Sequence, residues 1–294
     1  MKLSEINMSI LTTFVIVHLV TLGAIMSTDF HPSYLLWTLG LYCFKWLGFT
    51  CAVHRYFSHK VCRTSRWFQF VLAVWGTLTM ARSPIRFASG HRQHHLHSDS
   101  RHDLHSRKEH GFFRAYLGWV ISKAYHEDQL GRVGDLQRYP ELRWINRYYF
   151  VPNVGLLALL YAAGGLPGLV YGGLLSIIVV WHVAFAITVM LHTLGKPAYE
   201  THDESKNSLF LALLTFGEGW HNNHHANMAS ARLGHERTQI DIGYWVFLGL
   251  ERVGLIWDLK KSIEPRFYKR VSPPLGQRPT QIATATPGEC AEAA

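Results

Sequence analysis

Three histidines lie within the short stretch GEGWHNNHH, which runs from Gly217 to His225. His221, His224 and His225 are spaced i, i+3 and i+4, so a helix would place all three imidazoles on one face. Imidazoles packed together leave ring nitrogens without donors, and a bound metal ion resolves that shortage. For one such stretch taken alone, a surface histidine cluster on an amphipathic helix is an equal alternative.

The same residue pattern recurs at two other places in the chain. HRQHH repeats the i, i+3, i+4 spacing with His91, His94 and His95, and HRYFSH adds His54 and His59. Three histidine-rich segments in one chain of 294 residues make an accidental surface cluster a poor explanation. The pattern therefore predicts a metal centre that several segments build together.

The stretch that follows HRQHH also contains histidines, but their spacing is irregular. We expect His97, His102, His105 and His110 to be solvated or hydrogen-bonded rather than metal ligands. Asp99 and Asp103 are better candidates for a supporting role, since ligating imidazoles usually donate their second N–H to a carboxylate or a carbonyl.

The elements that must position these histidines are apolar. The chain is 48% hydrophobic and 17% charged and has ten Trp, a composition that favours a membrane protein. Its net charge of +9 is spread between and after the apolar runs, which argues against nucleic-acid binding. The four cysteines form no CxxC pair, so neither a disulfide framework nor a thiolate metal site is predicted.

Four apolar runs predict an all-α integral membrane protein whose helices form two hairpins. A nineteen-residue helix is about 28 Å long, close to the ~30 Å hydrocarbon core of a bilayer. The predicted spans are residues 9–27, 34–53, 148–163 and 169–190. Residues 54–147 and 192–272 would form a cytoplasmic helical cap, because the segment from Arg55 to Arg147 carries sixteen of the 29 Lys and Arg.

Two segments fall outside this scheme of spans. Residues 67–80 are apolar but too short to cross a membrane, so we expect an interfacial or re-entrant helix. Residues 1–272 would then form a single domain. Residues 273–294 are rich in Pro, Thr and Ala without apolar periodicity, and we expect them to be a disordered tail.

His192 lies outside the three histidine-rich segments but is predicted to join them. It ends an apolar run that is longer than the hydrocarbon core, so its ring would reach the side of the membrane where His54 emerges. His182 lies deeper in the same run and is expected to be a hydrogen-bonded core histidine. With His192 the set has nine imidazoles, enough for two metal ions of higher coordination and more than one tetrahedral zinc needs.

The segments HRYFSH, HRQHHLHSD and LLTFGEGWHNNHHA, in this order, resemble those of the membrane fatty acyl desaturases. The resemblance is to the bacterial and cyanobacterial branch of the stearoyl-type delta-9 enzymes, and it extends from about Tyr34 to Leu259. It implies two Fe²⁺ ions held by the three histidine boxes and His192. It also implies a kinked tunnel for the acyl chain and an active site that faces the cytoplasm, in a bacterial inner membrane.

The resemblance further implies the substrates and partners. Dioxygen would remove two hydrogens from an acyl chain carried on CoA, acyl carrier protein or a lipid. The chain has no haem-binding HPGG segment and no cysteine set for an iron–sulfur cluster. The two electrons are therefore expected from a separate ferredoxin or b-type cytochrome with its reductase.

Some positions around the boxes depart from the family pattern or extend it. Thr188 stands where the family usually has an Asn that holds a metal-bound water, and Ser89-Gly90 replaces a common Arg-Asp pair. Lys123 matches a basic group near the substrate headgroup. Inside the last box, Glu218 and Asn222 are expected next to the ligands.

Other functions share parts of this pattern. Hydroxylation or formation of a triple bond would use the same ligands, because those reactions differ in the fate of the substrate. A zinc-dependent membrane hydrolase or a metal-binding membrane protein without redox chemistry is the alternative from a different class, for which fewer histidines and a carboxylate ligand are expected.

Overall fold

The computed structural model describes residues 1–80, 82–126, 130–264 and 268–271. The predicted disordered tail, 273–294, lies outside these residues. Within them the chain is mostly helical, and the elements are η1 (Leu3–Glu5), α1 (Met8–Met26), α2 (Tyr34–Leu47), η2 (Gly48–Ser58), β1 (Arg63–Thr64), α3 (Arg66–Thr77), α4 (Pro84–His97), α5 (Arg107–His110), η3 (Arg114–Gly118), α6 (Lys123–His126), η4 (Leu130–Val133), α7 (Gly134–Gln137), α8 (Pro140–Arg147), α9 (Val151–Pro167), η5 (Gly168–Leu175), α10 (Ser176–Met190), α11 (Leu209–Leu214), α12 (His221–Ala226), α13 (Ile242–Arg252) and β2 (Ile256–Trp257).

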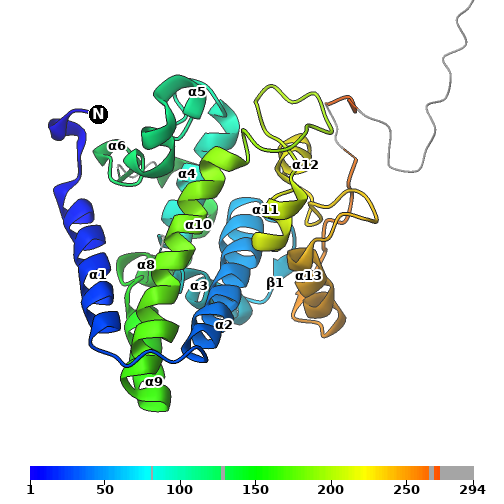
Figure 1. The fold of residues 1–294 in the computed structure, drawn as a ribbon. Coiled ribbons are helices and arrows are strands. Elements are labelled where there is room, and N and C mark those ends of the chain that lie inside the picture. Colours follow the sequence, from blue (N-terminus) through cyan, green and yellow to red (C-terminus); the bar gives the residue numbers. More distant parts are fainter. Residues whose placement is uncertain (81, 127–129, 265–267, 272–294) are drawn as a thin grey trace, which may run out of the picture.

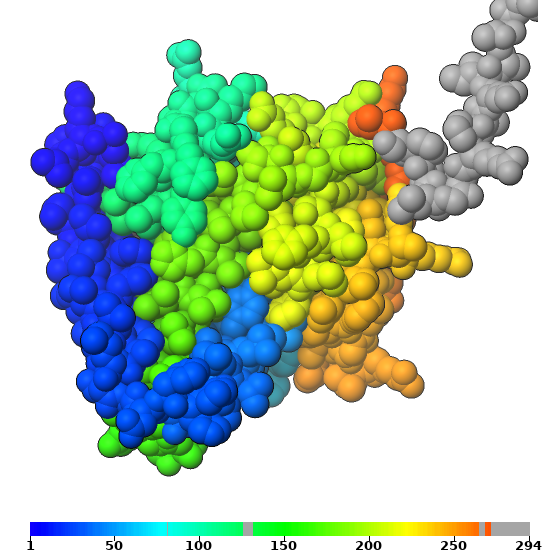
Figure 2. Space-filling model, in the orientation of Figure 1, coloured from blue at the N-terminus to red at the C-terminus, as the bar shows by residue number. Residues whose placement is uncertain are grey.

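Three helical runs in the described residues are long and apolar enough to cross a membrane. The first is α1, which begins after Asn7, whose side chain accepts a hydrogen bond from the Ile10 N–H. Little of α1 is buried within the chain, and it stands at one edge of the molecule (Figures 1 and 2). Its only strongly polar residue, His18, meets His182 of α10 at an Nε2 to Nε2 distance of 3.0 Å. This contact fastens α1 to the rest of the bundle.

The second run extends from Tyr34 to Ser58 and changes its winding partway. Residues 34–47 form an α-helix, and residues 48–58 form a π-helix, which closes its hydrogen bonds between residues five apart. The helix continues through His54 to Ser58, five residues beyond the predicted end of the membrane span at residue 53. The π-helix is buried along its whole length, packed against α3, α4 and α13.

The third run extends from Val151 to Met190 and is interrupted at Gly165, whose φ of 59° and ψ of −150° are not helical. A Cβ at Gly168 would lie 2.4 Å from the carbonyl oxygen of Leu160, and one at Gly173 would lie 2.4 Å from the Leu157 side chain. The chain on one side of Gly165 therefore packs directly against the chain on the other side. This reversal occurs in the glycine-rich stretch of residues 164–168, between the third and fourth predicted spans.

The remaining elements pack around these helices, and the two largest clusters of buried hydrophobic residues lie between them. One core joins η2, α3, α4, α8 and α13 through Phe57, Leu72, Ile85, Ile145 and Phe247. The other joins α2, η2, α10 and α11 through Trp46, Val53, Val180, Leu191 and Leu211. The fold also holds a two-residue antiparallel pair of strands, β1 and β2, which an all-α prediction did not include. The segment expected to be interfacial forms α3.

Candidate metal centre

The structure brings the nine predicted histidines into two adjacent groups. In each group the candidate ligand atoms lie within 4.8 Å of one another. The five-histidine group consists of His54, His59, His91, His95 and His224, and the four-histidine group consists of His94, His192, His221 and His225. His94 and His95 are neighbours on α4 and His224 and His225 on α12, so each of these helices contributes to both groups.

Local winding explains why each segment presents its histidines together. On α4 and α12 the i, i+3, i+4 spacing aligns the rings as an α-helix requires. His54 and His59 are five residues apart and would lie on different faces of an α-helix. The π-helix η2 stacks such positions, and the two ring centroids are 5.0 Å apart.

The ring nitrogens of the five-histidine group converge on one another. The Nε2 atoms follow one another at short distances. His54 to His224, His224 to His95 and His95 to His91 are each 3.0 Å, and His91 to His59 is 2.8 Å. His54 Nδ1 lies 2.6 Å from a Glu218 oxygen, so its proton belongs on Nδ1 and its Nε2 carries a lone pair. Convergent lone pairs in a buried site require a cation, and these residues therefore fit a metal ion.

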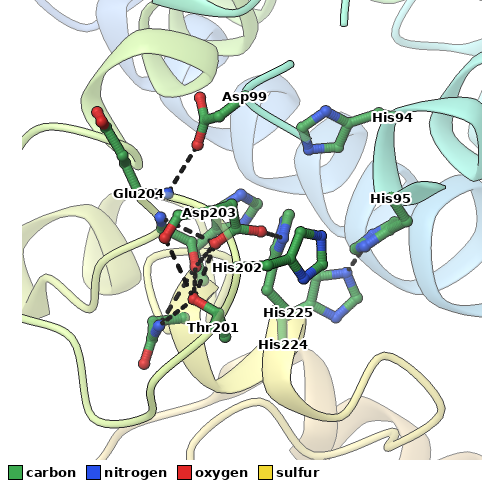
Figure 3. Close-up of polar contacts among 12 residues, drawn as sticks. His94, His95, Asp99, Thr201, His202, Asp203, Glu204, His224 and His225 are labelled. Atoms are coloured by element: carbon green, nitrogen blue, oxygen red, sulfur yellow. Dashed lines mark hydrogen bonds and ion pairs between the residues drawn. The ribbon is translucent and has the colours of Figure 1, made fainter. Parts of the chain in front are cut away.

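Three aspartates support the four-histidine group. His192 Nδ1 lies 2.7 Å from Asp99, and His94 Nδ1 lies 3.0 Å from Asp103. His225 Nδ1 donates to Asp203, whose carboxylate faces that ring in Figure 3. Each aspartate fixes the proton on Nδ1 and leaves Nε2 as the ligand atom. Among the described residues the buried Nε2 of His225 has no hydrogen-bond partner, which is the state expected of a nitrogen aimed at a metal ion.

Asp203 is a site residue that the sequence analysis missed. It lies in the charged connector between α10 and α11, outside the three histidine boxes. Asn222, which was expected next to a metal ligand, follows His221 on α12 and holds this connector in place. Its side-chain oxygen accepts from the Ala198 and Tyr199 N–H groups at 2.7 and 2.8 Å, and its nitrogen donates to Tyr199 O at 3.1 Å.

The other predicted residues have distinct environments. The Thr188 hydroxyl lies 2.7 Å from Ala115 O and 2.8 Å from Phe185 O, so its proton is directed to backbone carbonyls. Lys123 is exposed and precedes Ala124, which lines the cavity described below. His105, which was not expected to bind metal, lies 3.3 Å from Asp103 and joins His94 in a small additional group.

Burial keeps most of these imidazoles neutral. Burial first, and then the charge of neighbouring imidazoles, lowers the pKa well below its ordinary value for His59, His91, His95, His221 and His224. Burial also lowers the pKa of His225 to about 4, although Asp203 opposes this shift. Neutral imidazoles have the lone pairs that metal binding needs, so the site is ready for a cation at neutral pH.

An apolar cavity of about 270 Å³ ends at the two groups. His54, His91, His94, His192 and His221 line it at the histidine end. Much of the remaining wall is aromatic and comes from α1, η2, α4, α6, α10 and the residue that follows η3: Phe14, Phe49, Phe87, Trp119, Tyr125, Trp181 and Phe185. The cavity has room for an apolar molecule beside the candidate ligands.

These features define a class of membrane proteins in which clustered histidines meet an apolar cavity. The family model described as fatty acid desaturase matches residues 31–234, which is more than half of the chain. The protein therefore belongs to the fatty acid desaturase family, a family of oxidoreductases, as the histidine boxes predicted.

Individual relatives carry several related names. The Delta-9 acyl-lipid desaturase 2 of Arabidopsis thaliana is 34% identical over 241 residues, which is 79% of this chain and 78% of its own. The sn-1 stearoyl-lipid 9-desaturase of Anabaena variabilis is 34% identical over 215 residues, 73% of this chain and 79% of its own. A chloroplastic palmitoyl-monogalactosyldiacylglycerol delta-7 desaturase of Arabidopsis thaliana is 37% identical over 221 residues. The matched residues make up 74% of this chain but only 59% of that relative.

Proposed function

We propose that this protein is a membrane-bound, dioxygen-dependent fatty acyl desaturase that introduces a double bond into a long acyl chain, at the delta-9 position. The observation that carries this proposal is the convergence of nine imidazoles at the end of an apolar cavity, in a chain of the fatty acid desaturase family. The delta-9 position follows the names of two relatives.

Two Fe²⁺ ions would be held by the two histidine groups, one ion in each. Imidazole donors suit iron, and the absence of thiolates from both groups argues against a soft-metal site. When bound, the irons would supply the activation of dioxygen and the removal of hydrogen from an unactivated C–H bond. The carboxylates contribute by fixing each ligating imidazole in one tautomer and orientation.

The chain itself would bind and orient the substrate. An acyl chain has no polar handle near its middle, so its position depends on the shape of the apolar wall. Phe14, Phe87, Trp181 and Phe185 line the cavity and would exclude water from the acyl chain. The exposed Lys123, next to the cavity, is suited to an anionic part of the headgroup.

The reaction balances only with an external reductant. The acyl chain loses two hydrogens, and dioxygen takes up these, two further protons and two electrons to form two waters. A separate ferredoxin or b-type cytochrome with its reductase would supply the electrons. The acyl carrier would be a lipid, CoA or acyl carrier protein, since relatives named for each of these carriers match this chain.

Four membrane spans in two hairpins support this arrangement, with the cap and both histidine groups on the cytoplasmic side. The reversal at Gly165 divides the third apolar run into two helices, which would cross the membrane in opposite directions. The His54 end of the second run and the His192 end of the fourth span then lie on the same side, as a shared metal centre needs.

The test is expression of the full chain in a host with a compatible electron donor, followed by a fatty-acid profile and metal analysis. We expect a new monounsaturated acyl chain and about two irons per chain, and a His221→Ala variant should yield neither in full. Zinc alone at the site, with no change in the acyl profile of any lipid or thioester pool, would contradict the proposal.

One relative favours a second product for the same test. The hex-5-enoyl-[acyl-carrier protein] acetylenase of Moorena producens is 31% identical over 242 residues, 76% of this chain. Mass spectrometry distinguishes the outcomes, because a double bond, a triple bond and a hydroxyl group change the mass of the acyl chain differently.

A further inference from the structure

The two histidine groups differ in the charges that surround them, and this difference concerns the order of metal binding. We infer that the four-histidine group binds the first metal ion, more tightly than the five-histidine group binds the second. This inference rests on the proposed metal centre and goes beyond it by assigning unequal roles to the two positions. The residues that create the inequality are the three aspartates on one side and Arg55 on the other.

The four-histidine group has three buried carboxylates in direct contact with its rings. The side chains of Asp99, Asp103 and Asp203 are exposed by 8%, 2% and 0%. Their other hydrogen-bond partners are neutral: Asp99 accepts from the Glu204 N–H at 2.8 Å, and Asp103 accepts from the Asp99 N–H at 3.0 Å. Figure 3 shows Asp99 and Asp203 on the side of the histidines that faces the connector. In the described part of the chain, no Lys or Arg forms an ion pair with these aspartates.

The five-histidine group has one carboxylate, and that carboxylate is shared with a cation. Glu218 Oε2 contacts His54, while Glu218 Oε1 lies 3.4 Å from Nε of Arg55 and accepts from the Thr50 hydroxyl. Arg55 is completely buried and is itself held by Asp241 at 2.9 Å. Glu218, Arg55 and Asp241 together carry one net negative charge beside this group. The three aspartates beside the other group carry three.

The surroundings of Arg55 are built for a guanidinium. A Cβ at Gly217 would lie 2.7 Å from an Arg55 terminal nitrogen, and a Cβ at Gly243 would lie 2.9 Å from the same nitrogen. Arg55 also donates to the carbonyl of Ala231 at 2.9 Å. Because both glycines leave the space that the guanidinium fills, the cation next to Glu218 is a fixed feature of the five-histidine group.

These charges decide which group attracts a divalent cation more strongly. Buried charges are screened far less than exposed ones. Each carboxylate that no Lys or Arg neutralises therefore strengthens the attraction of a nearby metal ion. A carboxylate that accepts the Nδ1 proton also makes the imidazole a better donor, and its loss typically lowers metal affinity by about 10–100-fold. The fifth imidazole of the other group is a neutral donor and brings no charge. We therefore expect the three aspartates to outweigh it.

The test is a titration of metal-free, full-length protein in detergent with Co²⁺, followed by visible absorption and calorimetry. The wild-type protein should bind two ions in separate steps, the second at least about tenfold more weakly than the first. Asp203→Asn keeps a hydrogen-bond acceptor for His225 but removes the charge, so it should weaken the first step by about 10–100-fold. Glu218→Gln should weaken only the second step.

Asp258→Asn is the matched control, because Asp258 pairs with Arg63 at the exposed surface and should change neither step. Asp99→Asn should reproduce the effect of Asp203→Asn if the latter variant fails to fold by circular dichroism. Two ions that bind with equal affinity, or a Glu218→Gln variant that weakens the first step, would overturn the inference. Binding of no ion at all would instead contradict the proposed metal centre.

Discussion

At the scale of single residues, the site depends on pairs formed by one histidine and one carboxylate. Each carboxylate holds a proton on Nδ1, so that Nε2 faces the shared centre. His192 is the member of this set that no histidine box contains. Its Nδ1 lies 2.7 Å from Asp99 and its Nε2 lies 3.2 Å from His221 Nε2. His192 therefore lies with His94, His221 and His225 in the four-histidine group.

We expect His192→Ala to fold and insert normally but to lose desaturation, with metal affinity lowered by at least about tenfold. His97→Ala is the control, because His97 lies on α4 yet outside both histidine groups. Metal content, measured by mass spectrometry on detergent-purified protein, should fall only in the His192 variant. Near wild-type desaturation with full iron in His192→Ala would remove this residue from the site.

The acid sensitivity of the metal-free protein follows from the buried imidazoles. Burial lowers the pKa of His225 and of His105 to about 4, below the value of about 6.5 for histidine in an unfolded chain. Between these values the unfolded chain binds protons that the folded protein does not, so stability must fall as the pH falls. Among the described histidines only His94 has a raised pKa, because Asp103 outweighs the effect of burial, and it opposes this trend.

The thermal unfolding midpoint of metal-free protein in detergent should therefore be lower at about pH 5 than at about pH 7. Circular dichroism during heating measures this difference. The change should be smaller for a protein with its metal ions bound, because the ions compete with protons for the same nitrogens. An unfolding midpoint that stays constant or rises on acidification would show that the buried histidines do not control stability.

At the scale of elements, a change of helix type and the close packing of neighbouring helices determine where the residues of the site lie. The π-helix η2 aligns His54 with His59, and the reversal at Gly165 lets α9 pack against η5. This packing depends on an absent side chain, because a Cβ at Gly168 would lie 2.4 Å from the Leu160 carbonyl oxygen. A backbone oxygen cannot move aside without disturbing its helix.

Gly168→Ala should therefore lower the free energy of unfolding by about 1–3 kcal/mol, as expected for an overpacked contact. Gly155→Ala is the matched control in α9, where a Cβ meets nothing within 4 Å. The control should leave stability unchanged or raise it by about 0.5–1 kcal/mol, because alanine favours the helix. Thermal unfolding in detergent compares the two variants, and equal midpoints would contradict the close packing at Gly168.

At the scale of the whole molecule, the proposed topology divides the chain between a membrane, which the three apolar runs would cross, and a cap on one aqueous side. The proposed topology places both termini and the cap in the cytoplasm. Arg101 tests it well, because its side chain is 89% exposed on the cap and pairs only with Glu109 at 3.4 Å among the described residues.

An Arg101→Cys variant should react with a membrane-impermeant thiol reagent only after the cells are opened. Met26 is exposed at the C-terminal end of α1, which the proposed topology places on the opposite side of the membrane from the cap. A Met26→Cys variant should therefore react in intact cells. Labelling followed by mass spectrometry identifies the modified positions. Reaction of Arg101→Cys in intact cells would rule out the four-span topology with a cytoplasmic cap.

The sequence by itself determined the chemistry and the family. Histidine spacing of three and four residues is a local property of an α-helix, so HRQHH and GEGWHNNHH could be interpreted without a fold. Long apolar runs likewise indicate a membrane wherever they occur. The family assignment, the apolar helices and the identity of the nine candidate histidines were within reach of the sequence.

Only the tertiary structure decided how distant segments support those histidines. The pairing of Asp203 with His225 and of Arg55 with Glu218 joins residues that no local periodicity relates. The division of nine histidines into groups of five and four arises where η2, α4, α10 and α12 meet. Contacts of this kind depend on how helices pack against each other, and the spacing of residues along one helix carries no information about them.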